Sequence, residues 1–274
     1  MKKYLLLFML ITAALLYNYL AAPKTKPVLR IGVECDHVPY NWETGTPNKD
    51  NFPLANNPGF YADGYDVQIA AMIAARLEAQ PEFYKIPFDN LIGALNRGEI
   101  DAIFSGMVDT EDRKQSIDFT IPYEMRKTEY AALVHIDSKY IAARSIRELR
   151  GARMMAQSDS RFDEVIDQIP DVIHLPAKGT QAEVISELLK FSIDGTVLNY
   201  DTALSYARNH KEFRAVRFSE GNGFDLGFTG LCAGLRKGDE EMLENFNRMI
   251  EDIPMRQRLR IMDRAIIRAG DDLN

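Results

Sequence analysis

Cysteine is scarce in this sequence, because only Cys35 and Cys232 occur among its 274 residues. This excludes a disulfide-rich scaffold and a structural zinc site built from several thiolates. In an oxidising compartment the two cysteines could form one disulfide, and two buried free thiols are the alternative. The four histidines are scattered without the spacing of metal ligands, so we expect neither a metal nor another cofactor.

The sequence also lacks an excess of positive charge. It carries 33 Lys and Arg against 40 Asp and Glu, a formal net charge of −7, without a long run of one sign. Because nucleic-acid phosphates are bound by basic surfaces, a nucleic-acid partner is not expected. Solenoid repeats, low-complexity segments and a phosphate-binding P-loop are absent too. The short Gly221-Asn222-Gly223 segment does not make a dinucleotide-binding fingerprint.

The longest hydrophobic run stands at the N-terminus. Residues 5–16 follow two lysines, and residues 20–22 read Leu-Ala-Ala. This is the pattern of a cleaved secretory signal, which we predict over residues 1–22. An uncleaved membrane anchor is the alternative, because residues 5–22 together approach the length of a spanning helix. No cysteine lies near the cleavage region, so a free periplasmic protein is expected rather than a lipoprotein.

The rest of the chain is predicted to be an α/β protein. Its 46% hydrophobic content suffices for one large domain or two lobes. The order strand, helix, strand, helix, strand favours right-handed crossovers and a mostly parallel sheet. A polar segment rich in Gly, Pro and Asn, residues 41–64, is expected to be a loop. In the first half we expect strands at 29–34, 83–86 and 100–104, a helix from 66 and a short helix at 89–96.

A second α/β unit follows in the remainder of the chain. We expect strands at 130–134, 153–156, 194–198 and 231–235, and helices at 146–149, 162–169, 181–191, 202–209, 240–253 and 255–269. Ligands of parallel sheets bind beyond the carboxyl ends of the strands. Residues 35–37 and 105–113 follow predicted strands, so they occupy that kind of position.

One arginine in such a position is the most informative residue of the chain. Arg113 comes soon after the buried strand 100–104 and the small-residue turn at 105–106. A guanidinium stays charged and pairs with a carboxylate through two parallel hydrogen bonds. We therefore predict a clamp for a small carboxylate. The alternative is a surface arginine that pairs with Glu111 or Asp112.

A series of segments resembles one known family. The resemblance is to the extracellular solute-binding proteins, family 3, which serve polar amino-acid ABC importers and have the type II periplasmic-binding-protein fold. It covers nearly the whole mature chain. The segments that carry it are LRIGVE at 29–34, VPYNW at 38–42, GYDVQIA at 64–70, FDNLIGALNRGEIDAIFSGM at 88–107, TEDRKQSIDFTIPY at 110–123, ELRGARM at 148–154, IDG at 193–195 and GLRKGDEEML at 234–243.

The resemblance implies two α/β lobes with mostly parallel sheets, joined by a two-strand hinge, with the ligand closed between them. Lobe 1 would combine residues 27–123 with 219–274, and lobe 2 would comprise residues 124–218. The hinges should lie near residues 122–128 and 218–227, which carry Pro and Gly. The partners implied are a small-molecule ligand and the membrane subunits of an ABC permease, with the protein itself a monomer.

The resemblance also implies which residues bind the ligand. Arg113 matches the family arginine that holds the ligand α-carboxylate, and backbone N–H groups around 105–108 would share the anion. Phe88 and His37 match positions whose rings flank the ligand, with core packing or a surface loop as the alternatives. Glu34 matches an acidic position that would favour an amino group or a cationic side chain, and a solvated strand end is its alternative. The full set of ligand-binding candidates is Arg113, Ser105, Gly106, Val108, Thr110, Glu34, His37, Phe88, Ser160 and Asn199, with Tyr40 and Trp42 as a further wall or as packing residues.

Three positions depart from the family pattern. Val108 stands where a Ser or Thr hydroxyl helps to bind the carboxylate, and Asn199 stands where an acidic residue pairs with the α-ammonium. Asp159 precedes Ser160 where Gly is common, and it could repel a carboxylate or receive the ammonium. Asp201 could compensate for Asn199 after a local shift. These changes put an ordinary α-amino acid in doubt and leave a carboxylate ligand, because Arg113 remains.

The leading function is a binding protein that delivers an amino acid or related carboxylate to an ABC permease and performs no chemistry. An enzyme on the same scaffold is the alternative, since periplasmic cyclohexadienyl or arogenate dehydratases resemble these proteins. Glu34 or Asp159 would then act as the general acid. The sequence shows no nucleophile–base pair or metal cluster in favour of catalysis. A receptor-partner paralogue with altered ligand is a third possibility, motivated by the three departures.

Overall fold

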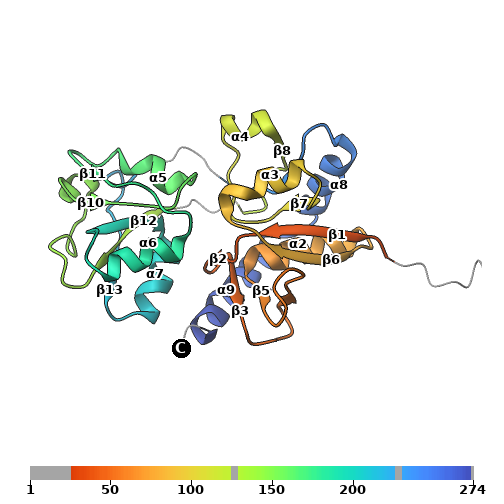
Figure 1. Cartoon of the computed structure of the whole chain (residues 1–274), viewed down its shortest axis with the longest axis horizontal. Helices are drawn as coiled ribbons and strands as arrows, with labels where there is room; N and C mark the ends of the chain where they lie inside the picture. Colours follow the sequence, from red (N-terminus) through yellow and green to blue (C-terminus); the bar gives the residue numbers. More distant parts are fainter. Residues whose placement is uncertain (1–25, 125–128, 226–229, 273–274) are drawn as a thin grey trace, which may run out of the picture.

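The computed structural model of the protein describes residues 26–124, 129–225 and 230–272. It has two α/β lobes side by side, and the chain passes between them twice (Figure 1). The predicted signal segment, residues 1–22, lies outside the described residues. The two predicted hinges, 122–128 and 218–227, lie partly outside them.

The first lobe is built on a five-stranded sheet of strand order β6-β1-β7-β14-β8. β1 pairs in parallel with β6 and β7, whereas β14 runs antiparallel between β7 and β8. The strands are β1 (Val28–Val33), β6 (Gln80–Lys85), β7 (Ala102–Ile103), β8 (Ile117–Phe119) and β14 (Gly234–Arg236). The helices are α2 (Tyr65–Arg76), η1 (Phe88–Asn90), α3 (Leu91–Asn96), α4 (Glu111–Ser116), α8 (Glu240–Glu251) and α9 (Met255–Asp272).

The second lobe repeats this plan with strand order β11-β10-β12-β9-β13. Here β9 is the antiparallel strand, between β12 and β13. The strands are β9 (Tyr130–His135), β10 (Arg153–Met154), β11 (Ile173–His174), β12 (Gly195–Asn199) and β13 (Phe213–Val216). The helices are η2 (Ile146–Leu149), α5 (Arg161–Ile166), α6 (Gln181–Leu189) and α7 (Tyr200–Asn209). The predicted mostly parallel, two-lobe α/β architecture is confirmed.

The expectation of a loop over residues 41–64 is wrong. The chain there contributes to a small antiparallel sheet of order β2-β3-β5-β4, made of β2 (Asp36–His37), β3 (Asn41–Thr44), β4 (Phe52–Pro53) and β5 (Tyr61–Asp63). Its polar side chains have partners within the fold. Arg268 of α9 donates to both carboxylate oxygens of the buried Asp63, and Asn48 donates to the same carboxylate. Composition alone cannot show this, because the pairing partner lies 205 residues away.

Buried hydrophobic side chains form separate cores in the two lobes. The cores of the first lobe draw on residues before 124 and after 230, and the core of the second lobe draws on residues between 130 and 216. Phe218 and Phe224 pack against the second core. Both cysteines are buried and free, Cys35 and Cys232 alike, which agrees with the free-thiol alternative.

A buried polar network ties the start of α2 to the chain just before it leaves the first lobe. The Asp66 carboxylate is fully buried and accepts hydrogen bonds from Asn41 Nδ2 at 2.8 Å and Tyr123 Oη at 2.9 Å. Burial raises the pKa of Asp66 to about 7, and these two donors oppose that rise. The Tyr123 carbonyl in turn accepts from Tyr65 Oη and Arg258 Nη1. The network therefore fixes the exit from the first lobe.

Tyr123→Phe tests the weight of this network. The change removes one donor from a buried carboxylate, so the free energy of unfolding should fall by about 1–3 kcal/mol. Urea unfolding followed by circular dichroism measures the difference. Tyr61→Phe, at a half-buried tyrosine of β5, is the matched control and should stay within about 0.5 kcal/mol of the parent protein. Equal losses for the two variants would show that the Asp66 hydrogen bond contributes nothing specific.

Candidate functional site

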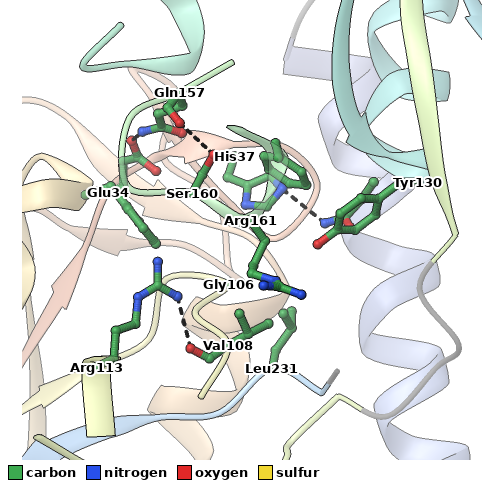
Figure 2. A pocket seen from close by; sticks show the side chains of 13 residues that line it. Glu34, His37, Gly106, Val108, Arg113, Tyr130, Gln157, Ser160, Arg161 and Leu231 are labelled. Carbon is green, nitrogen blue, oxygen red and sulfur yellow. Dashed lines mark hydrogen bonds between the residues drawn. The ribbon is translucent and has the colours of Figure 1, made fainter. Parts of the chain in front are cut away.

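A cavity of about 40 Å³ lies between the two lobes (Figure 2). Eight of its lining residues are ones that the sequence analysis proposed as ligand-binding. They are Glu34, His37, Phe88, Gly106, Val108, Arg113, Ser160 and Asn199. The remaining lining residues are Tyr130, Gln157, Arg161, Phe162 and Leu231. The cavity therefore gathers predicted site residues from both lobes.

The parallel sheets explain why these residues meet. Glu34 follows β1 directly, and Gly106 lies three residues beyond the end of β7. Asn199 is the last residue of β12, and Gln157 follows β10 by three residues. All four lie at or beyond carboxyl ends of strands, where ligands of such sheets bind. Each sheet thus delivers its strand ends to the same gap.

Arg113 lies on α4, a helix that starts at the Thr110 cap, whose Oγ1 accepts from the Arg113 N–H at 3.4 Å. The guanidinium Nη1 donates to the Val108 carbonyl at 3.0 Å, and Nη2 donates to the Asp159 carbonyl in the other lobe. The guanidinium carbon lies 5.3 Å from the centre of the Phe88 ring, within reach of a cation–π interaction. The arginine fork is therefore held at the boundary between the lobes.

Burial lowers the pKa of Arg113, and the positive charge of Arg161 lowers it further. The negative charges of Glu164 and Asp159 act in the opposite direction. A guanidinium remains protonated even so, because its ordinary pKa lies above 12. A positive charge that is partly removed from water requires a negatively charged partner or strong dipoles nearby. In this closed form two backbone carbonyls supply the dipoles.

Two of the predicted residues support the site without lining the cavity. Ser105 is fully buried, and its Oγ accepts from the Glu34 N–H at 3.0 Å. Thr110 caps α4 and so positions Arg113. The backbone N–H of Gly106, expected to share in anion binding, donates to the Asp66 carboxylate instead. Anion binding in this closed form would therefore rest on side chains more than on that amide.

Glu34 is the one acidic side chain among the described residues that line the cavity, and its pKa is strongly shifted. It is only 4% exposed, and burial raises its pKa to about 8, with the negative charge of Asp36 adding to the rise. Gln157 Nε2 donates to Glu34 Oε1 across the lobe boundary and also to the Gly179 carbonyl at 3.2 Å. The hydrogen bond from Gln157 lowers the pKa, although burial has the larger effect. Glu34 is therefore largely protonated at neutral pH.

His37 and Asn199 form a second contact between the lobes. The His37 Nε2 and Asn199 Nδ2 atoms are 3.4 Å apart, and the edge of the Phe162 ring meets the imidazole with centroids 5.7 Å apart. Burial lowers the pKa of His37 to about 4, so the ring is neutral at pH 7. Gly106 has φ +62°, and a Cβ there would lie 3.0 Å from His37 Nδ1. Only glycine suits both the backbone and the space beside this ring.

Several other predicted residues lie away from the cavity. The Asp159 side chain is exposed, and the residue reaches the site only through its carbonyl oxygen. Asp201 does not line the cavity either. Tyr40 and Trp42 are buried in the core of the first lobe, so packing is their role in this structure. Neither aspartate therefore lines the cavity.

Five of the lining residues are not apparent as site residues from the sequence. Gln157, Arg161 and Phe162 flank the Asp159-Ser160 pair, so the turn that was singled out is also the signal for its neighbours. Tyr130 begins β9 and Leu231 precedes β14. Their apolar surroundings predict buried strands and give no sign that one end faces the other lobe. Only the three-dimensional arrangement of the lobes reveals their place.

A further contact joins the lobes beside the cavity. Asp36 Oδ2 accepts from the Ala182 N–H at 2.9 Å, at the N-terminus of α6. Thr180 caps that helix, and Glu183 completes a capping box. A carboxylate at a helix N-terminus interacts favourably with the helix dipole. The second lobe is therefore held by a charged contact as well as by the cavity residues.

The described part of the chain contains no group of three or more His, Cys, Asp or Glu side chains able to hold a metal ion. The helices described between residues 26 and 272 include none with the length and apolar character needed to cross a membrane.

The raised pKa of Glu34 predicts a pH dependence of stability. Between the ordinary pKa of 4.5 and the folded value of about 8, the native state binds the extra proton, so the free energy of unfolding falls as pH rises. The slope should reach about 1 kcal/mol per pH unit. Urea unfolding at pH 5, 6, 7 and 8 should show that Glu34→Gln flattens it. The exposed Glu111→Gln is the control, and parallel curves for all three proteins would contradict the assignment.

Comparison with known proteins identifies relatives of similar sequence and fold. The chain is 27% identical over 232 residues to a probable histidine-binding protein of Campylobacter jejuni, covering 83% of this chain and 80% of the relative. It matches an amino acid ABC transporter substrate-binding protein from Streptococcus pneumoniae, bound to L-arginine, with a TM-score of 0.74 and 22% identity, covering 87% of this chain and 93% of the other.

A third similar protein is an ancestral amino acid-binding protein described as a precursor of cyclohexadienyl dehydratase. Its TM-score is 0.68 at 23% identity, covering 87% of this chain and 95% of that one. These two structural matches establish the shared fold. Residues 29–264 match the sequence model of one family over most of the chain. The chain belongs to the bacterial extracellular solute-binding proteins, family 3.

Proposed function

We propose that this protein is the extracytoplasmic solute-binding protein of an ABC importer and that it binds a small amino acid or related carboxylate between its lobes. The observation that carries the proposal is the Arg113 guanidinium, half-buried at the lobe boundary in a cavity lined by both lobes. An arginine in such a place matches a carboxylate bidentately. The relatives that bind histidine or arginine support an amino acid as the ligand class.

The size of the cavity implies that binding and lobe movement are linked. A volume of 40 Å³ has room for about three water molecules, which is far less than an amino acid needs. The lobes must separate for the ligand to enter. In the filled form, ligand atoms would take the place of the contacts from Gln157 to Glu34 and from Arg113 to the Asp159 carbonyl. The ligand thus joins surfaces that already complement each other.

The remaining parts of the proposal follow from the family. We keep residues 1–22 as a secretory signal, 27–123 plus 219–274 as lobe 1 and 124–218 as lobe 2, with the described residues 219–225 in contact with the second lobe where the chain returns. The mature protein would act in the periplasm as a monomer and dock on the membrane subunits of its permease. Delivery of a ligand to the permease requires no chemical step from the binding protein itself, and the family and its curated relatives are binding proteins. The Asp159 carboxylate, one of two candidate acids for a dehydratase, does not line the cavity.

A thermal-shift screen of the purified mature protein tests the proposal. Amino acids and dicarboxylates are added at concentrations well above micromolar Kd values, and a true ligand should raise the melting temperature by binding linkage. Prephenate and arogenate are included, and the samples are also analysed for aromatic products. A shift without turnover supports a binding protein. Turnover would support a dehydratase, and the absence of any shift would favour a receptor-partner paralogue.

Arg113→Ala should lower the affinity for whichever carboxylate the screen identifies by about 100-fold or more, because it removes a bidentate charge-assisted contact. Isothermal titration calorimetry measures the loss. Arg97→Ala is the matched control, since Arg97 is exposed and pairs with Glu99 on the surface. Retained affinity in Arg113→Ala would place the carboxylate clamp elsewhere.

Asn199→Asp should raise the affinity for α-amino acids about tenfold if residue 199 faces the α-ammonium, because a carboxylate supplies the missing countercharge. The matching carboxylic acid that lacks the amino group should bind the variant no better than the parent protein. Calorimetry with both compounds separates the effects. Unchanged or weaker amino-acid binding would count against this position for the ammonium.

A further inference from the structure

The charges that line the cavity are unbalanced. Arg113 and Arg161 contribute two guanidinium groups, whereas Glu34 is the single acidic side chain among the described lining residues. Glu34 is engaged by Gln157, and burial favours its neutral form. Asn199 is neutral and faces the neutral His37. The lining residues themselves are net positive, with Glu164 outside the lining as the partner of Arg161, and such a site favours a ligand that brings more than one negative charge.

Arg161 is the unexpected member of this set. It lies at the first position of α5, directly after the Ser160 cap, and Figure 2 shows its side chain extending into the space near Gly106 and Val108. Its side chain is 28% exposed, and its guanidinium contacts Glu164. Glu164 is 50% exposed, so this ion pair is in contact with solvent and weakly held. Arg161 can therefore exchange Glu164 for an acidic group of a ligand.

Tyr130 supplies an uncommitted hydroxyl in the same region. It lines the cavity and is only 8% exposed. Burial raises the pKa of Tyr130, and the positive charges of Arg161 and Arg113 oppose that rise. Within the described residues its hydroxyl forms no hydrogen bond. A phenol hydroxyl and a neighbouring guanidinium can both donate hydrogen bonds to the same carboxylate. Tyr130 and Arg161 are thus two donors that the closed cavity does not fully use.

We propose that Arg161 and Tyr130 form a second anion-binding subsite, so that this protein selects a ligand with two acidic groups, such as an acidic amino acid or a short dicarboxylate. The inference rests on the proposed function, because Arg113 holds the first carboxylate. It differs from the cationic or imidazole ligands named for the relatives. The second acidic group neutralises the charge that Asn199 and the protonated Glu34 leave unbalanced.

The test compares acids with their neutral amides by isothermal titration calorimetry. L-glutamate is paired with L-glutamine and L-aspartate with L-asparagine, and succinate, L-arginine and L-histidine are added. At least one acid should bind about tenfold or more tightly than its amide, as expected for a charge-assisted contact. Arg161→Gln should weaken the acid about 10- to 100-fold and the amide less than about threefold, and Tyr130→Phe should weaken the acid selectively by a smaller factor.

Arg214→Gln is the matched control, because Arg214 is an exposed arginine of the second lobe that does not line the cavity. It should leave the preference for the acid intact. Equal affinities for acid and amide, tighter binding of L-arginine, or a uniform loss in Arg161→Gln would overturn this inference. If those ligands still depended on Arg113, the proposed function would stand. Binding of none of these compounds would overturn this inference, and the wider thermal-shift screen would then decide the proposed function.

Discussion

A half-buried guanidinium at the junction of two lobes, that of Arg113, is the constraint on which the site depends. Partial burial disfavours the charged form of Arg113, and each lobe supplies one carbonyl acceptor to its guanidinium. The Val108 carbonyl comes from its own lobe and the Asp159 carbonyl from the other. Closure therefore satisfies the charge in part, and a carboxylate satisfies it better. Under the proposed function, the energetics of this one side chain link lobe position to ligand occupancy.

The other contacts across the boundary share one property, since most are neutral or easily replaced. Glu34 is held mainly in its protonated form beside Gln157, and His37 is uncharged beside Asn199. Contacts of this kind stabilise a closed form without the cost of separating strong ion pairs. The charged exception is the Asp36 carboxylate of β2, which accepts a hydrogen bond from the Ala182 N–H at the N-terminus of α6. Asp36 is not one of the cavity-lining residues. Opening therefore requires few strong bonds to break.

Much of the architecture could be predicted from the sequence. Apolar spacing and strand order were sufficient for the α/β class and for most helices and strands, because each is set by local periodicity. The small sheet over residues 41–64 could not be predicted, since its polar residues depend on Arg268 far along the chain. Eight of ten proposed residues line the cavity, whereas Ser105 and Thr110 support it from behind. Tyr130 and Leu231 could not be predicted as cavity residues, because an apolar residue in a predicted strand gives the same sequence pattern whether it faces the core or a cleft.

The pairing of Gly106 with His37 has a consequence for how this site can change over generations. A side chain larger than hydrogen at 106 would meet the imidazole at 3.0 Å and would also strain a backbone with φ +62°. Replacing the ring alone leaves a gap beside Phe162. The two positions therefore constrain each other, whereas Arg161, whose side chain is partly exposed and pairs with the half-exposed Glu164, is less constrained by its surroundings.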